Sequence, residues 1–259
     1  MIALGRTQHW TGPDASRTPE PAVQWNLSLF GWWQLRRADT EFSPRRREQR
    51  LIALLALQGA RPRSYVAGVL WPDSTEQRAT GNLRAAVWRI EHELPGLLLH
   101  DRTRLSLEDP VRLDVDAFTR CATAIFGWRS GNQPLDGAGC LRCLPVLLRG
   151  DLLPGWYDDW VIYERARLAQ LRLHALELLA DLLVDRGETS AALVAASTAV
   201  AIEPLREAAT RALIRAHIED GDYPGALRDY EAYRSRVQAE LGLRPSARLQ
   251  GLVRPLLGS

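Results

Sequence analysis

The stretch RATGNLRAAVWRIEHELPG, residues 78–96, has the pattern of a helix with one apolar face and one unusually bare face. Four apolar residues recur at helical spacing and predict a buried stripe: Leu83, Val87, Ile90 and Leu94. Five residues lie off this stripe, and only one of them is charged: Thr80, Gly81, Arg84, Ala85 and Trp88. Because an exposed helix face normally carries several charged side chains, this face is suited to close approach by a partner. The dipeptide Pro95-Gly96 predicts the end of the helix.

The residues before this helix predict strands and a first helix. Residues 25–43, WNLSLFGWWQLRRADTEFS, alternate in character and contain aromatic side chains. We therefore expect two short strands with a turn near Ala38–Asp39. Ser43 is the expected N-cap of the following helix and Pro44 its first residue, and Gly59 is expected to end it.

A second helix and a hairpin complete this region. The helix in RSYVAGVLWPD is expected to be capped by Ser64 and to stop before Pro72. After the opening helix, residues 97–100 and 104–107 alternate across a short polar turn and predict a β-hairpin. Strands, three helices and a hairpin in this order predict a winged helix-turn-helix, whose third helix enters the DNA major groove and whose hairpin is the wing.

The sequence divides into three predicted regions. Residues 1–24 contain Gly, Pro, Ser and Thr without periodicity and predict a disordered arm. Residues 25–109 form the predicted winged-helix domain, and the pattern is helical from Val111 onward, so residues 110–259 predict an all-α domain. The expected fold class is mainly α: an α+β winged helix followed by an all-α, tetratricopeptide-like domain.

An internal repeat supports the second domain. The segments LADLLVDRGETSAALVAASTAV and LIRAHIEDGDYPGALRDYEAY align at an offset of 34 residues, which is the tetratricopeptide period. This alignment places Gly187 over Gly221 and Ala192 over Ala226. Because such repeats bury a continuous core only when stacked, we expect the helices from Asp116 to Asp185 to stack with them.

Composition narrows the classes of function. All 33 basic residues are arginine, so a lysine-dependent phosphate loop and a Schiff-base enzyme are excluded. Residues 25–107 hold thirteen arginines and eight acidic residues, whereas residues 108–259 hold eighteen and twenty-one. A basic first domain followed by a mildly acidic one indicates that the two predicted domains have different functions. The sequence has neither a long apolar segment nor a signal-peptide pattern, so we expect a cytoplasmic protein.

Cysteines and carboxylates give no clear catalytic or metal site. Cys140 and Cys143 form a CxxC within an apolar helical pattern, with Cys121 upstream, and buried thiols fit better than a zinc site or a redox switch. Asp158 and Asp159 favour capping and packing over acid–base chemistry. We therefore expect no enzyme, no metal and no cofactor.

Four segments together resemble the Streptomyces antibiotic regulatory proteins, a group of bacterial transcription activators. These segments are SPRRREQRLIALLAL, VLWPDSTEQRATGNLRAAVWRIEHELPGLLL, LRGDLLPGWYDDWVIYERARLAQLRLHALELLADLL and YPGALRDYEAYRSRVQAELGLRPSARL. The resemblance covers about residues 26–257, is most distinctive over Arg149–Glu177, and points to the small, two-domain type. It implies an OmpR-type winged helix joined to a bacterial transcriptional activation domain.

The resemblance also implies partners. Members of this group bind direct repeats in promoters, often as side-by-side pairs, recruit RNA polymerase through its sigma factor, and commonly switch on biosynthetic clusters. We accordingly expect double-stranded DNA, RNA polymerase and a homodimer on DNA as partners, and no membrane. The alternative that remains open is a tetratricopeptide-like adaptor or scaffold without specific DNA binding.

Candidate DNA contacts follow from this reading. Arg84 can form a bidentate pair with guanine, while the small residues Gly81 and Ala85 admit the backbone to the groove. Thr80 can reach a phosphate or a thymine methyl group, and Trp88 can touch the sugar–phosphate backbone or fold onto the wing. Glu91 and Glu93 must then lie beyond the groove. A solvated Arg84 and a packing role for Trp88 are the alternatives.

Contacts to phosphate and to the minor groove are also expected. Arg45, Arg46 and Arg47 stand in a helical first turn, where the helix dipole disfavours cations, and a nearby phosphate backbone explains that choice. The full set of phosphate candidates is Arg45, Arg46, Arg50, Arg63, Ser64 and Arg89. The wing candidates for the minor groove are Arg102 and Arg104. The alternative that both are ordinary solvated arginines of a hairpin explains them nearly as well.

Overall fold

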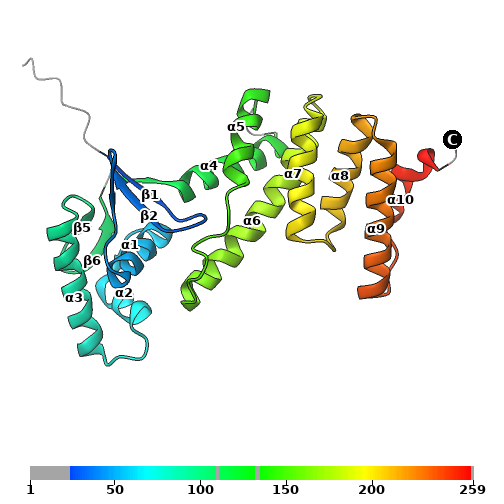
Figure 1. Ribbon diagram of the computed structural model, residues 1–259. Coiled ribbons are helices and arrows are strands. Elements are labelled where there is room, and N and C mark those ends of the chain that lie inside the picture. The colour runs from blue at the N-terminus through cyan, green and yellow to red at the C-terminus, as the bar shows by residue number, and fades with distance from the viewer. Residues whose placement is uncertain (1–23, 109–110, 132–134, 258–259) are drawn as a thin grey trace, which may run out of the picture.

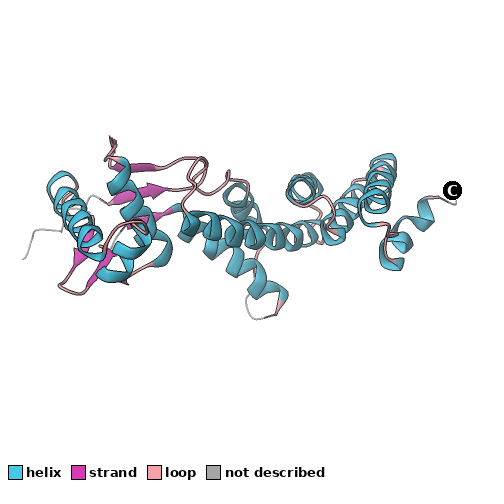
Figure 2. Cartoon of the chain, turned by 90° about the horizontal axis from the view of Figure 1, so that it is seen from below, coloured by secondary structure: helices cyan, strands magenta, loops and turns pink. Residues whose placement is uncertain are grey.

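The computed structural model describes residues 24–108, 111–131 and 135–257. The predicted arm, residues 1–24, lies outside the described residues except for Gln24. The chain is elongated, with a winged helix at one end and a row of stacked helices extending from it (Figure 1). Strands are confined to the winged-helix end (Figure 2). The predicted fold class, a mainly α chain that begins with a winged helix, is confirmed.

The N-terminal sheet has the strand order β3-β2-β1-β7. Its strands are β1 (Trp25–Ser28), β2 (Gln34–Arg37), β3 (Thr40–Phe42) and β7 (Val111–Leu113). The turn at Ala38, which has φ of 48°, is where the sequence predicted it. The prediction of only two strands was wrong, and so was the prediction of helix from Val111, since Val111–Leu113 pairs in parallel with β1.

Three helices follow β3 along the chain and pack against one another: α1 (Arg46–Gln58), α2 (Arg63–Leu70) and α3 (Glu76–Glu93). Gly59 ends α1 with φ of 71°, as predicted. The predicted caps were wrong. Arg45 holds the N-cap position of α1 without a side-chain hydrogen bond, so Ser43 and Pro44 lie outside that helix. Ser64 is inside α2, because the extended Pro62 pairs with the wing immediately before it.

The wing is a three-stranded sheet rather than a simple hairpin. Its order is β4-β6-β5, formed by β4 (Arg61–Pro62), β6 (Arg104–Leu107) and β5 (Leu98–His100). The antiparallel pairing of β5 with β6 confirms the predicted hairpin. The added strand β4 joins the wing to the start of α2, so the wing is continuous with the helix-turn-helix core.

The rest of the chain is helical. Its helices are α4 (Asp114–Arg129), α5 (Gly137–Leu147), α6 (Asp159–Val184), α7 (Thr189–Ile202), α8 (Glu207–Glu219), α9 (Tyr223–Leu241), α10 (Ala247–Val253) and the 3-10 turn η1 (Arg254–Leu256). The repeat pairs α6 with α7 and α8 with α9. Gly187 and Gly221 follow equivalent helices with positive φ, and Ala192 and Ala226 are fully buried at equivalent positions. These features agree with a tetratricopeptide-like arrangement.

One apolar core extends from the winged helix into the helical region. Phe30 of the N-terminal segment packs against Phe118 of α4 with ring centroids 5.1 Å apart. The side chain of Arg172, on α6, lies over both rings and donates a hydrogen bond to the Gly150 carbonyl at 2.8 Å. Both β7 and α4 contact β1 of the N-terminal sheet, and the boundary between the two domains stays a prediction.

Cys140 and Cys143 are buried in α5, and Cys121 on α4 is half-buried. This agrees with the predicted buried thiols. Within the described ranges, no group of three or more His, Cys, Asp or Glu side chains could hold a metal ion. None of the described helices is both long and apolar enough to cross a membrane.

Candidate nucleic-acid interface

The apolar stripe of α3 faces the core and leaves the bare face exposed. Leu83, Val87 and Ile90 are fully buried, as predicted from their spacing. Leu94 is also buried but stands at the C-cap, beyond the last helical residue. Four of the five candidate base-contact residues are exposed and the fifth is half-buried: Gly81, Arg84, Ala85, Trp88 and Thr80. The helix begins where Thr75 Oγ1 accepts a hydrogen bond from Arg78 N at 3.4 Å.

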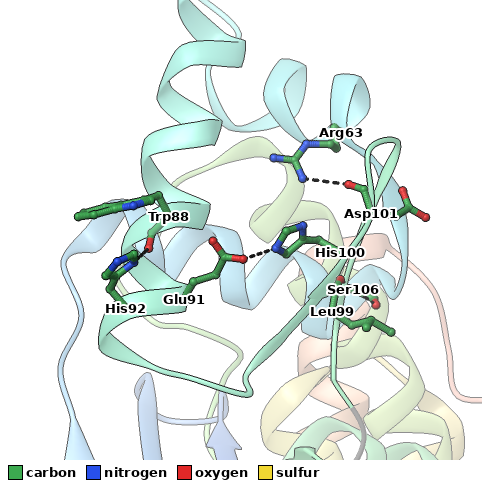
Figure 3. A network of polar contacts seen from close by, with 8 residues as sticks. All are labelled: Arg63, Trp88, Glu91, His92, Leu99, His100, Asp101 and Ser106. Atoms are coloured by element: carbon green, nitrogen blue, oxygen red, sulfur yellow. Dashed lines mark hydrogen bonds and ion pairs between the residues drawn. The ribbon is translucent and has the colours of Figure 1, made fainter.

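Trp88 stacks on His92 one turn further along the same face. The ring centroids are 4.0 Å apart, and His92 Nδ1 lies 2.9 Å from the Trp88 carbonyl (Figure 3). The indole remains 58% exposed. Trp88 therefore neither packs in the core nor folds onto the wing, which were two of its predicted roles. The stacked pair extends the exposed face of α3 with a flat aromatic surface.

The wing tip is held in shape by Asp101. Its Oδ1 accepts hydrogen bonds from Thr103 N at 2.6 Å, Thr103 Oγ1 at 2.8 Å and Arg104 N at 2.7 Å. The backbone and hydroxyl donors of Thr103 stabilise the charged carboxylate and so lower the pKa of Asp101 below its ordinary value. Arg102 and Arg104 are exposed on either side of this turn. The predicted minor-groove arginines thus project from an ordered loop.

Two contacts fix the wing to the helix-turn-helix (Figure 3). At the start of α2, Arg63 N donates to Thr103 O at 2.8 Å, and Arg63 Nη1 donates to Asp101 O at 3.3 Å. On the other side, His100 Nε2 contacts the Glu91 carboxylate of α3. Glu91 was expected to lie beyond the groove, and the structure places it against the wing. The start of α2, which carries Arg63 and Ser64, thereby lies on one surface with the wing and α3.

Besides Arg63, three more of the predicted phosphate contacts have side-chain partners inside the protein. The guanidinium of Arg46 lies 3.5 Å from the centre of the Trp156 ring, and partial burial lowers its pKa. Arg50 pairs with Asp158 at the start of α6. Arg89 pairs at 3.5 Å with Glu48, whose side chain is buried.

These pairings change the interpretation of the first-turn arginines. Arg46 contacts Trp156 in the loop before α6, and Arg50 contacts Asp158, the N-cap residue of α6. These internal contacts account for basic side chains on α1 without a bound phosphate. Arg45 is exposed and remains a candidate phosphate contact. Like Arg63, each of Arg46, Arg50 and Arg89 would have to give up an internal partner to contact phosphate, and their place in the interface stays a prediction.

A buried carboxylate that the sequence did not single out joins the start of α4 to the segment that follows β1. Asp114 accepts hydrogen bonds from Leu29 N and Phe30 N at 2.9–3.0 Å, and Arg149 approaches it to 3.6 Å. Burial raises the pKa of Asp114, and the two backbone N–H groups oppose that shift. The sequence did not reveal that Asp114 accepts these hydrogen bonds, because Asp114 and Leu29 are 85 residues apart.

Comparison with known proteins agrees with this architecture. The family described as "Bacterial transcriptional activator domain" matches residues 113–257. The regulatory protein AfsR of Streptomyces coelicolor is 28% identical over 214 residues, which is 80% of this chain and 21% of AfsR. A structure of Mycobacterium tuberculosis EmbR, in complex with a low affinity phosphopeptide, superposes with a TM-score of 0.67 at 19% identity. That match covers 90% of this chain and 65% of the EmbR chain, and it shows a shared fold.

The chain thus spans about a fifth of AfsR and under two thirds of the EmbR chain. AfsR is by name a regulatory protein. The family match covers more than half of the sequence and the whole repeat region. The chain belongs to the bacterial transcriptional activator domain family.

Proposed function

We propose that this chain activates transcription by binding a specific DNA sequence through α3 and its wing. The observation that supports this most strongly is the bare face of α3, which is exposed beside an ordered, arginine-bearing wing. A helix reads bases only where its backbone can approach the floor of the major groove, and Gly81 and Ala85 provide that access. Arg84 is the one charged side chain among the five candidate residues.

Each candidate side chain on this surface is assigned a specific contact with DNA. Arg84 donates a bidentate pair to guanine O6 and N7, which is worth about 1–3 kcal/mol of discrimination. Thr80 contacts a phosphate or a thymine methyl group, and Trp88 lies along the sugar–phosphate backbone. Arg45, Ser64 and the N-terminal turn of α2 contact phosphates.

The wing supplies the second groove contact. Arg102 enters the minor groove from the wing tip, and Arg104 contacts the adjacent backbone. Because Asp101 and Arg63 order this loop before DNA arrives, little conformational entropy is lost on binding.

The family supports finer proposals about the biological setting. We infer that the chain binds direct repeats in promoters as a side-by-side homodimer and recruits RNA polymerase through its sigma factor. It would act in the cytoplasm at the nucleoid and switch on a biosynthetic gene cluster. In vitro transcription with purified RNA polymerase on a promoter that carries the direct repeats tests recruitment. Activation that requires both repeats supports recruitment of the polymerase. Basal transcription alone refutes it.

Specific DNA binding is tested by selection from fragmented genomic DNA, followed by fluorescence anisotropy of selected and scrambled duplexes in a salt series. The proposal predicts at least a hundredfold preference for the selected duplex, and weak, strongly salt-dependent binding to the scrambled one. If no fragment is enriched, the DNA-binding proposal fails. The tetratricopeptide-like adaptor then becomes the better account of the chain.

A further inference from the structure

The C-terminal end of the helical region differs in charge from the rest of that region. Residues 223–257 contain six arginines and three acidic residues, whereas residues 108–222 contain twelve arginines and eighteen acidic residues. The helices α9 and α10 with η1 therefore form a basic end on an otherwise acidic domain. Figure 1 places this end at the opposite extreme of the chain from α3. Contact with DNA bound at α3 does not account for a basic surface in that position.

This basic end contains a groove of about 600 Å³ between α9 and the segment that follows it. Tyr230, Arg234 and Gln238 lie along its α9 wall, which extends to Ala239. Arg244, Pro245 and Gln250 line the opposite wall. Nine residues of helix rise by about 14 Å, which is roughly the length of four residues of extended chain. The groove therefore has the dimensions of a short peptide segment.

Two arginines stand on facing walls of the groove with exposed guanidinium groups. Arg234 pairs only with Glu231 on its own helix, in a contact where both side chains are about half exposed. Such an exposed i,i+3 pair is worth only a few tenths of a kcal/mol, so a ligand carboxylate can replace it. Arg244 is exposed and takes part in none of the ion pairs found in the described part of the chain. Both can therefore turn toward an anion, and a guanidinium fork matches a carboxylate bidentately.

The nearby acidic groups do not fill the groove. Glu207 accepts hydrogen bonds from both the backbone N and the hydroxyl of Ser246, which satisfies its carboxylate beside the loop. Glu240 is exposed on α9 but is not among the groove-lining residues. The two arginines are thus the charged groups that line this groove.

The floor of the groove combines apolar surface with amide groups. Tyr230 and Pro245 are largely buried and expose only the edges of their rings to the groove, beside the exposed Ala239. The side chain of Gln250 donates to the Pro245 carbonyl at 2.7 Å, which fixes its amide at the edge of the groove. Gln238 brings a second, exposed amide. Apolar surface flanked by amides and arginines suits a peptide that alternates acidic and apolar side chains.

We propose that this groove binds an acidic, extended protein segment, with Arg234 and Arg244 pairing to its carboxylates and the surface of Tyr230 and Pro245 receiving an apolar side chain. The groove would give the activator a protein-binding surface separate from its DNA-binding surface. A nucleic acid is the less suitable ligand, because two arginines on facing walls of a short groove do not follow a phosphate backbone.

The test uses the full chain and a fluorescein-labelled peptide of repeating Asp-Glu-Leu, with a repeating Asn-Gln-Leu peptide as the neutral control. Fluorescence anisotropy is measured for the wild type, for Arg234→Ala/Arg244→Ala and for Arg236→Ala. Arg236 is an exposed arginine of the same helix that does not line the groove, so it is the matched control. Thermal melting of each variant establishes that it is folded.

The proposal predicts that the wild type and Arg236→Ala bind the acidic peptide alike, that the double variant binds at least tenfold more weakly, and that the neutral peptide does not bind. Absence of wild-type binding, or equal binding by the double variant, overturns the proposal. Promoter affinity should be the same in the double variant and the wild type. Loss of promoter affinity instead would assign the groove to DNA and also overturn it. Failure of peptide binding leaves the DNA-binding proposal untouched, because that proposal is tested by promoter affinity alone.

Discussion

The Glu91 carboxylate of α3 contacts the imidazole of His100 on the wing, which fixes the angle between the two parts of the molecule proposed to touch DNA. Both side chains are about one-third to two-fifths exposed, so the contact contributes modestly to stability. Its value lies in preorganisation. A wing already positioned against α3 reaches its groove without a further ordering cost.

Replacing His100 by Ala should therefore weaken specific DNA binding by about three- to tenfold, because the wing loosens and Glu91 loses its partner close to DNA. Fluorescence anisotropy with the selected duplex measures the change. Leu99→Ala is the control, since Leu99 is an exposed neighbour on the same strand and is not part of the ion pair between His100 and Glu91. Equal losses in both variants would contradict a specific role for the His100 contact.

The ion pair between Arg50 and Asp158 should stabilise the protein rather than bind DNA. Both side chains are about four-fifths buried, so Arg50→Ala is expected to cost about 1–3 kcal/mol in unfolding free energy. Specific DNA affinity should change by less than threefold. Denaturant unfolding of Arg50→Ala, Asp158→Asn and the double variant measures the coupling energy. A large loss of DNA affinity with unchanged stability would return Arg50 to the DNA interface.

Asp101 should titrate at an unusually low pH. Its pKa is lowered by hydrogen bonds from Thr103 and Arg104 that form only in the folded wing. Since the folded pKa lies below the unfolded value, the carboxylate stabilises the wing turn above pH ~4, and this contribution is lost as the pH falls through the lowered pKa. The amide NMR signal of Thr103 should report a midpoint below about 3.9. A midpoint at or above that value contradicts the hydrogen-bonded turn, and Asp101→Ala should remove the transition.

Cys121 should be the most reactive thiol. A hydrogen bond with Cys143 lowers the pKa of Cys121 to about 7, while the same contact and burial raise the pKa of Cys143. Alkylation by iodoacetamide, followed by mass spectrometry across a pH series, should modify Cys121 with half-maximal rate near pH 7 and leave Cys140 and Cys143 largely unmodified. In Cys143→Ala the midpoint should rise toward the ordinary thiol value of about 8.5. An unchanged midpoint would show that Cys143 is not the cause.

Local patterns predicted the elements that depend on local physics. The stripe of Leu83, Val87 and Ile90 defines α3, because 3.6-residue periodicity is a property of the helix itself. The pairs Gly187–Gly221 and Ala192–Ala226 revealed the repeat for a similar reason, since each glycine ends a helix by adopting positive φ. The predicted base-contact face followed from the same spacing and is exposed as expected.

Features that depend on distant partners were not predictable in this way. The three-residue strands β3 and β7 exist because neighbouring strands accept them, and Val111–Leu113 pairs with β1 across more than 80 residues of sequence. The internal partner of Arg50 is Asp158, which is 108 residues away, and the sequence did not reveal this contact. The buried role of Asp114 was missed for the same reason. A sequence shows which side chains carry charge but does not show which charges meet.

The central claim is that α3 reads bases through Arg84. Its most direct test is the anisotropy of Arg84→Ala on selected and scrambled duplexes, with Arg120→Ala, an exposed arginine of α4, as the control. Losing one bidentate guanine contact should weaken binding to the selected duplex by about 10- to 100-fold and leave weak binding to the scrambled duplex nearly unchanged. The control should bind both duplexes like the wild type. If Arg84→Ala retains the full preference for the selected duplex, α3 does not read DNA as described.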